Sequence, residues 1–325
     1  MKLISIVIPC YNEEKSIELF YSTVQPVLEN INYIDYEFIY VNDGSKDATE
    51  AKLREISKAE KNVRYISFSR NFGKESAMLA GIEAALGDAV ILMDVDLQDP
   101  PELLPQMIED WFVEGFDVVY TRRSTRSGEP PIRSWFAKQF YKLINAMSDV
   151  QIVDGARDYR LMDRKAVDSF LRIKERNRFA KGLFMWVGYK SKCIEFENVE
   201  RAVGTSSWSF WKLVQYAIDG IVSFTTSPLR WATYFGFFTA SSAFLYMFYT
   251  IFKKILFGNA VGGYASIVSI LLFFGGIQLI FLGIIGEYIG RIFIEVKARP
   301  NYIIKEQSPS SDAKKVKGRQ AVLKR

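Results

Sequence analysis

Residues of the types that bind phosphates and cations cluster at three places, each directly after a short apolar run. The clusters are 9–14 (PCYNEE), 42–45 (NDGS) and 94–99 (DVDLQD). Taken singly, each is also typical of a helix N-cap, where Asp, Asn and Ser are favoured. Ligands of open α/β sheets bind at the carboxyl ends of the strands, so three such clusters at one edge favour a binding site.

The third cluster indicates what is bound. Asp94 and Asp96 lie two residues apart after the apolar run 90–93 and can share one hard cation with the phosphates of a ligand. Gln98 adds an amide oxygen two residues further on. Oxygen-rich, partly open sites of this kind suit Mg²⁺ or Mn²⁺. Short acidic triplets are common in loops, but the position after a predicted buried strand strengthens this interpretation.

The composition excludes several kinds of chemistry. The 325 residues include no histidine, so a Ser-His-Asp triad, a histidine general base and a histidine-ligated zinc site are impossible. The chain contains neither a GxxxxGK[ST] phosphate loop nor a GxGxxG dinucleotide fingerprint. Its two cysteines, Cys10 and Cys193, form no CxxC pair. A cation would have to hold a diphosphate, which indicates a nucleotide-activated donor with a nucleoside diphosphate leaving group.

The elements that must position these clusters follow an alternating pattern typical of strand–helix–strand units, which predicts an α/β fold around a parallel sheet. We expect strands over 3–8, 37–41, 63–68, 89–93 and 117–120, and helices over 13–28, 48–59, 74–85 and 102–114.

Two uncharged stretches of 22 residues, 231–252 and 265–286, predict a hairpin of membrane-spanning helices, which need about 20 apolar residues each. Two buried core helices are the weaker alternative. The flanks of the hairpin carry more Lys and Arg than its loop, so residues 1–228 and the tail are predicted to be cytoplasmic at the inner (plasma) membrane. Glycines at 275, 276 and 283 are compatible with a homo-oligomer but fix no stoichiometry.

The net charge of +5 is concentrated at the C-terminus, because residues 305–325 hold seven cations and two anions. A neutral body argues against nucleic acid as a partner, and a basic tail favours an anionic bilayer. The stretch 307–317 is typical of disorder. The aromatic segment 204–224 predicts either a helix lying in the membrane interface or an ordinary amphipathic helix packed on the sheet.

Four motifs together resemble family 2 glycosyltransferases of the polyisoprenyl-phosphate hexose transferase type, which comprises dolichol-phosphate mannose synthases and bacterial bactoprenol glucosyltransferases. The resemblance covers about residues 3–230, and the two-helix hairpin is similar to the bacterial branch. The motifs are IPCYNEE (8–14), VNDGS (41–45), SRNFGK (69–74) and MDVDLQDPP (93–101).

The resemblance implies a GT-A (Rossmann-like) fold and assigns the donor site. Asp94 would contact the ribose or the diphosphate, and Asp96 and Gln98 would hold Mg²⁺ or Mn²⁺. The residues that would hold the nucleoside are Pro9, Tyr11, Glu13 and Asp43.

A lipid phosphate acceptor would be held by arginines, whose planar forks fit phosphate oxygens. Arg122, Arg123, Arg126 and Arg133 follow the fifth predicted strand. By family position Arg122 and Arg133 are the acceptor candidates, and Arg201 would bind the donor diphosphate or the acceptor. Solvation at the surface is the alternative for each arginine, and it is favoured for Arg123 and Arg126. Ala137 stands where some family members have serine.

The segment GARDYRLM (155–162) resembles the family segment that carries a proposed catalytic base, and Asp158 matches that carboxylate. A phosphate monoester has a second pKa near ~6, so the acceptor is mostly a dianion at neutral pH and needs little deprotonation. We therefore expect Asp158 chiefly to orient an arginine or the sugar, with base catalysis as the lesser alternative. Lys181 would neutralise phosphate, although a solvated helix end is an equal alternative.

The sequence thus predicts inverting transfer of a hexose, with UDP-glucose and undecaprenyl phosphate as the favoured pair. Other donors (GDP-mannose, UDP-galactose, an aminoarabinose donor) stay open, as does a non-catalytic partner in lipid-carrier translocation. A processive polysaccharide synthase is disfavoured because the Q-x-x-R-W motif is absent. The predicted regions are a nucleotide-sugar-binding and catalytic domain (1–165), the rest of that domain with interface helices (166–228), the transmembrane hairpin (229–292) and a basic cytoplasmic tail (293–325).

Overall fold

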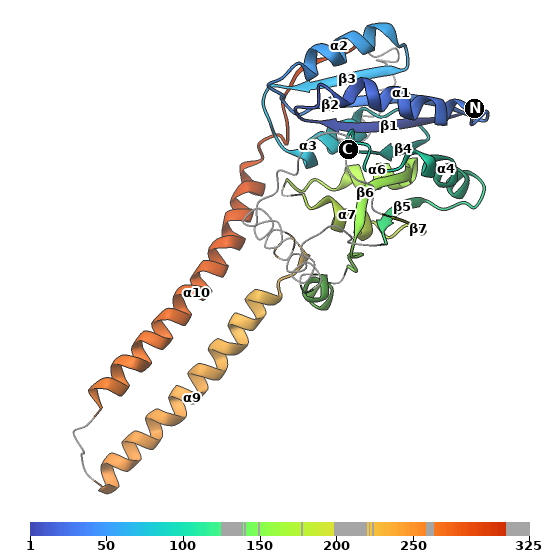
Figure 1. The fold of residues 1–325 in the computed structure, drawn as a ribbon. Helices are drawn as coiled ribbons and strands as arrows, with labels where there is room; N and C mark the ends of the chain where they lie inside the picture. The colour runs from blue at the N-terminus through green and yellow to red at the C-terminus, as the bar shows by residue number, and fades with distance from the viewer. Residues whose placement is uncertain are drawn as a thin grey trace.

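The computed structural model describes residues 1–124, 139, 141–148, 150–176, 178–197, 220, 222, 224–257 and 263–309. The N-terminal part of the chain begins with an alternation of strands and helices that follows the predicted pattern closely (Figure 1). Its elements are β1 (Lys2–Cys10), α1 (Ser16–Glu29), β2 (Ile34–Asn42), α2 (Thr49–Ala59), β3 (Val63–Phe68), α3 (Lys74–Ala84), β4 (Ala89–Leu92), a 3₁₀ turn η1 (Pro101–Leu103), α4 (Leu104–Phe112) and β5 (Val118–Arg123).

The elements that follow complete the sheet and then leave it. They are β6 (Ala156–Asp163), α6 (Arg164–Arg172), α7 (Ala180–Trp186), β7 (Ser191–Phe196), α9 (Ser227–Phe257), α10 (Tyr264–Lys297) and β8 (Ile304–Gln307). In Figure 1, α9 and α10 extend side by side away from the sheet as a long hairpin.

The eight strands form one sheet in the order β7-β5-β6-β4-β1-β2-β3-β8. The five predicted strands, β1–β5, run parallel to one another as expected. The sheet as a whole is mixed, because the unpredicted β6 is antiparallel to β4 and β5, and β8 is antiparallel to β3. The alternating pattern revealed only the first five strands. The β6 segment carries charged residues at 157, 158 and 160, and β8 (IKEQ) is largely polar, so neither has the apolar run that predicts a buried strand.

Helices cover both faces of the sheet, and one apolar core lies on each face. On one face α1, α2 and α4 pack against strand residues such as Ile6 and Phe38. On the other, α3, α6 and α7 pack against Val7 and Ile39, the neighbouring positions in the same strands. Successive strand residues point to opposite faces, so strands buried on both sides are apolar throughout, as β1 (KLISIVIPC) is.

The end of the chain departs from the predicted tail. The helix α10 continues to Lys297, and after a short connection β8 joins the edge of the sheet beside β3. The disorder expected from Gln307 onward is wrong at its first residue, since Gln307 pairs with Ile66. Residues 310–325 lie outside the described residues. An exposed edge strand needs only one paired side, which permits the polar composition of β8.

Candidate active site

The three polar clusters meet at the carboxyl edge of the central strands, as predicted. Neighbouring β1, β2 and β4 are parallel and end at Cys10, Asn42 and Leu92. The first two loops are joined directly, because the amide of Asp43 donates to the carbonyl of Cys10 at 2.9 Å. The amide of Asn12 donates to Ser45 Oγ at 2.9 Å.

Asp43, expected to hold the nucleoside, is buried and holds a neighbouring loop. Its two carboxylate oxygens accept hydrogen bonds from the amides of Phe72 (2.6 Å) and Gly73 (2.9 Å). Burial raises the pKa of Asp43, although these two amides favour its charged form. Gly44 follows with a φ of 64°, and a Cβ there would lie 2.3 Å from the backbone of Arg70. Residues 69–73, here called the RNFG loop, therefore pack tightly over the end of β2.

Pro9, Tyr11 and Glu13, which were also expected to hold the nucleoside, lie in three different environments. Tyr11 is 43% exposed and its ring is available to a ligand, whereas Pro9 is half-buried within β1. The carboxylate of Glu13 accepts a hydrogen bond from Ser16 Oγ at 2.7 Å, at the start of α1. In this structure Glu13 thus stabilises the turn into the helix beside Tyr11.

The DVDLQ turn holds the two predicted metal-binding residues. Leu97 has a φ of 54°, an uncommon conformation for a bulky residue and one that clusters at functional sites. The amide of Gln98 donates to Asp96 Oδ1 at 3.2 Å, and Gln98 Oε1 accepts from Arg123 Nη2 at 3.1 Å.

Asp96 and Gln98 offer oxygen donors from one turn, which fits Mg²⁺ or Mn²⁺. No group of three His, Cys, Asp or Glu side chains suited to a metal occurs within the described part of the chain. A cation held here would need further oxygens from its ligand, as Mg²⁺ commonly does with substrate phosphates.

The ammonium group of Lys74 forms ion pairs with two carboxylates, those of Asp94 and Asp158. Lys74 Nζ lies 2.7 Å from Asp94 Oδ1 and 2.7 Å from Asp158 Oδ2. Both carboxylates are about four-fifths buried, with exposures of 21% and 19%. Lys74 is the first residue of α3 and follows the RNFG loop directly. The sequence motif included Lys74, but sequence reasoning gave it no role, because nothing in the spacing brings it to Asp94 and Asp158.

These contacts determine the charge state of Asp158. Burial alone would raise its pKa, but the ammonium groups of Lys74 and Lys181 lower the pKa of Asp158 below its usual range. Burial lowers the pKa of Lys181, while Asp158 partly counteracts this effect. Lys181 is thus a half-buried cation near Asp158, in the first turn of α7.

A second ion pair, between Arg157 and Asp99, lies beside the DVDLQ turn. Arg157 Nε lies 3.1 Å from Asp99 Oδ1, and its Nη2 lies 3.7 Å from Asp94 Oδ2. Asp99 is only 1% exposed, and its other oxygen accepts from the amide of Asp94 at 3.2 Å. Burial raises the pKa of Asp99 to about 6, although Arg157 opposes this shift. Asp99 belongs to the third polar cluster of the sequence, but no role of its own was predicted for it, and none was predicted for Arg157.

The acceptor side is described in part. Arg122 is 42% exposed near the end of β5, with its Nε 3.7 Å from Glu195. Arg133 and Arg201 lie outside the described residues, as do Arg126, Ala137 and nearly all of 204–224.

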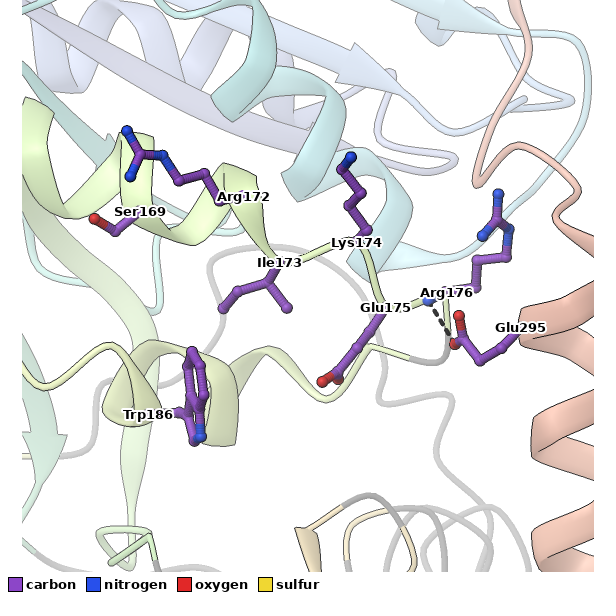
Figure 2. A pocket seen from close by; sticks show the side chains of 8 residues that line it. All are labelled: Ser169, Arg172, Ile173, Lys174, Glu175, Arg176, Trp186 and Glu295. Carbon is purple, nitrogen blue, oxygen red and sulfur yellow. Dashed lines mark hydrogen bonds between the residues drawn. The ribbon is translucent and has the colours of Figure 1, made fainter. Parts of the chain in front are cut away.

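A separate cavity of about 690 Å³ lies where α6 and α7 approach the end of α10 (Figure 2). None of the predicted site residues lines it. Figure 2 shows the amide of Arg176 donating to Glu295 of α10, at 2.7 Å. The junction therefore attaches α10 to the catalytic half and is distinct from the charged cluster at the strand ends.

One helical stretch among the described residues, Phe273–Lys297, is long and apolar enough to cross a membrane, with a mean hydropathy of 1.7 and none of its most apolar window buried. It overlaps the second predicted span. The first, 231–252, lies within α9. No stretch of the described residues of α9 passes the same test, although this helix exposes many aromatic side chains such as Phe237 and Phe238.

Comparison with known proteins gives matches over nearly the whole chain. Residues 5–171 match the model of glycosyl transferase family 2, and residues 227–292 match the GtrB C-terminal hairpin. Putative glycosyltransferase CsbB of Bacillus subtilis is 47% identical over 95% of this chain and 94% of its own. The SfII prophage-derived bactoprenol glucosyl transferase of Shigella flexneri is 47% identical over 93% of this chain and 97% of its own.

Among solved structures, glucosyl-3-phosphoglycerate synthase from Mycobacterium tuberculosis, in complex with Mn²⁺, UDP and phosphoglyceric acid, matches with a TM-score of 0.48 and 21% identity. The match covers 68% of this chain and 76% of that one.

Proposed function

Because the chain belongs to glycosyltransferase family 2, with a GT-A catalytic fold and a GtrB-type hairpin, we propose that it transfers glucose from UDP-glucose to undecaprenyl phosphate. The observation that carries this proposal is the attachment of an apolar helix to the domain that holds the charged cluster, through Arg176 and Glu295. An enzyme built in this way meets a water-soluble donor and a lipid acceptor at one surface. The 47% identity to a bactoprenol glucosyl transferase supports the same pair of substrates.

The reaction is a single displacement with inversion. An oxygen of the lipid phosphate forms a bond to the anomeric carbon as the bond from that carbon to the UDP oxygen breaks, and the electron pair leaves with the diphosphate. The acceptor phosphate is already largely a dianion at neutral pH, since its second pKa is near ~6. The protein therefore has to align two anions and stabilise the charge that moves onto the departing diphosphate.

The residues at the strand ends divide these tasks. Asp96 and Gln98 would hold Mg²⁺ or Mn²⁺, which when bound neutralises the diphosphate. Lys74 and Lys181 supply fixed positive charge beside Asp158. Arg122, with Arg133 and Arg201, is the proposed contact for phosphate oxygens.

Asp158 is proposed to orient the charged groups around it. Its lowered pKa makes it a weak proton acceptor at neutral pH, which supports orientation over base catalysis. Asp158 instead fixes the ammonium of Lys74 at 2.7 Å, and Lys74 in turn fixes Asp94.

We also propose that both helices of the hairpin cross the membrane, with residues 1–228 on the cytoplasmic side. The apolar stretch Phe273–Lys297 supports one crossing, and the exposed aromatic side chains of α9 support the second. A small tag inserted at Gly262 should be accessible to protease added from outside the cell. Protection of that tag would contradict the arrangement.

The test of the activity uses detergent-purified protein with Mn²⁺ or Mg²⁺. UDP and GDP release is measured from a panel of nucleotide sugars, with and without undecaprenyl phosphate, and Asp96→Ala is the control. Release that needs both the lipid and the cation supports a transferase, and the best donor identifies the sugar. Retained lipid binding without any release would favour the non-catalytic translocation partner.

A further inference from the structure

The segment after α10 contacts the RNFG loop that covers the end of β2. This segment, residues 299–308, is here called the strap. The amide of Ser69, the first residue of the RNFG loop, donates to the carbonyl of Ile303 in the strap at 3.0 Å. The second half of the strap, β8 (Ile304–Gln307), pairs with β3, which leads directly into the same loop.

Tyr302 links the strap to the elements on both sides of the RNFG loop. Its ring stacks on Phe68, the last residue of β3, with centroids 4.9 Å apart and an interplanar angle of 13°. Its hydroxyl donates to the carboxylate of Glu83 on α3. The stacked ring holds Phe68, where the RNFG loop begins, and the hydroxyl ties Tyr302 to α3, the helix that follows the loop.

The contact continues into the site. Phe68 meets Phe72 edge to face at 5.8 Å, and the amides of Phe72 and Gly73 are the donors to Asp43. The next residue, Lys74, bridges Asp94 and Asp158. An unbroken series of contacts thus leads from the strap to the carboxylates at the strand ends.

The other end of the strap is also fixed. Arg176 Nε donates to the carbonyl of Arg299 at 2.7 Å, and the amide of Arg176 donates to Glu295 near the end of α10 (Figure 2). The strap therefore runs from a fixed point on the membrane helix to the RNFG loop.

We propose that the strap holds the RNFG loop in its donor-binding conformation, and that Tyr302 is a positioning residue for the nucleoside diphosphate. The inference rests on the proposed function, because it takes the donor to be a UDP-sugar. Without the Tyr302 ring, the RNFG loop gains conformations that do not present Phe72 and Gly73 to Asp43. Donor binding then has to select the productive conformation, which weakens affinity.

The experiment is a calorimetric titration of the full-length protein in detergent with UDP and Mn²⁺. Tyr302→Leu removes the stacked ring and should raise the Kd for UDP about tenfold. Tyr302→Phe keeps the ring and should retain a Kd close to that of the wild type. Tyr302→Met, a milder change, should raise Kd in the same direction if the leucine variant does not fold.

Tyr189→Leu is the matched control. Tyr189 is also a partly buried tyrosine packed against the same apolar core, and its hydroxyl is bonded to Ser169 at 2.7 Å, away from the strap. This variant should lower Tm and leave the Kd for UDP unchanged. A wild-type Kd in the leucine or methionine variant of Tyr302 would overturn the proposal, and so would an equal rise in Tyr189→Leu.

Failure of the proposed function gives a different result. Wild-type protein that binds GDP in place of UDP contradicts the proposed donor, and the same four variants are then compared with GDP. Wild-type protein that binds neither nucleotide contradicts the proposed function itself.

Discussion

Two networks of ion pairs lie at two different edges of the same sheet. At the carboxyl edge, Lys74 joins Asp94 and Asp158 from three separate elements. At the lateral edge, Arg54 and Lys305 bind Glu50 and Glu306 around the pairing of β3 with β8. By side-chain exposure the two networks are alike, since Lys74 and Arg54 are both 44% exposed and Asp158 and Glu50 both 19%. They differ in what acts on the charges: burial is the largest influence on the pKa of Lys74 and of Asp158, whereas their hydrogen bonds are the largest influence on the pKa of Arg54 and of Glu306.

The difference indicates what each network does. Ion pairs at the protein surface contribute little to stability, so the lateral network chiefly keeps charge on an edge that would otherwise pair with another chain. Half-buried charges interact more strongly, and their positions matter to any charged ligand. We therefore expect substitutions at the carboxyl edge to change activity, and those at the lateral edge to change very little.

Asp96→Ala should give the largest effect, a loss in kcat of about 1,000-fold, because under the proposed function the departing diphosphate would lose the cation that neutralises its charge. The measurement is UDP release with Mn²⁺ and undecaprenyl phosphate. Asp47→Ala, an acidic residue of the second loop, serves as the control for general loss of negative charge. An Asp96→Ala enzyme that retains full activity would remove the basis for a metal site at the DVDLQ turn.

Lys74→Met should lower kcat/KM about 100-fold, since Asp94 and Asp158 then repel each other and the site loses a fixed positive charge. Lys52→Met is the control, because Lys52 also pairs with a carboxylate at 2.7 Å but lies on the outer surface of α2. Comparable losses in both variants would mean that the two kinds of ion pair do not differ in the way described.

Asp158→Asn should lower kcat roughly 30-fold by releasing the ammonium of Lys74. The wild-type pKa of Asp158 is lowered, so its carboxylate is already ionised at pH 6 and above, and the activity loss should be constant from pH 6 to 9. The check is a pH–rate profile of both enzymes. If high pH restores the variant, Asp158 acts as a base and the orientation role is wrong.

Glu75→Gln tests a buried charge beside the same network without removing a site residue. Burial raises the pKa of Glu75 to about 7, so the folded protein binds this proton more tightly than the unfolded chain does. Wild-type stability should therefore fall as pH rises from about 4.5 to 7. The Gln variant should have a higher Tm than the wild type at pH 8 and an equal Tm below pH 4.5, measured in detergent by calorimetry.

Arg54→Gln should have the smallest effect. It removes the pairs with Glu50 and Glu306 at the lateral edge, where solvent screens both. Activity and Tm should match those of the wild type within experimental scatter. A clear loss of activity would show that the lateral network also supports the donor site.

The sequence was sufficient to predict the part of the fold where local pattern and burial agree. Strand β3 was predicted at its exact limits, 63–68, because its apolar run is bounded by turn residues on both sides. The carboxyl-edge clusters were also predicted, since the topology of α/β folds brings strand ends together.

The remainder depends on contacts between residues far apart in the chain. Lys74 and Asp158 are 84 residues apart, and Arg157 reaches Asp99 across 58. No local pattern reports such a pair. Asp43 was predicted as a nucleoside contact, but its burial and its bonds to Phe72 and Gly73 became visible only once the RNFG loop was placed.

The position of β8 also determines when the sheet is finished during biosynthesis. Tyr65 and Ser308 pair across 243 residues, and both helices of the hairpin lie between them. At a translation rate of about 5–20 residues per second, the outer side of β3 stays unpaired for roughly 10–50 seconds after it leaves the ribosome. The last strand of the sheet is therefore made only after both helices of the hairpin, and the sheet stays incomplete until then.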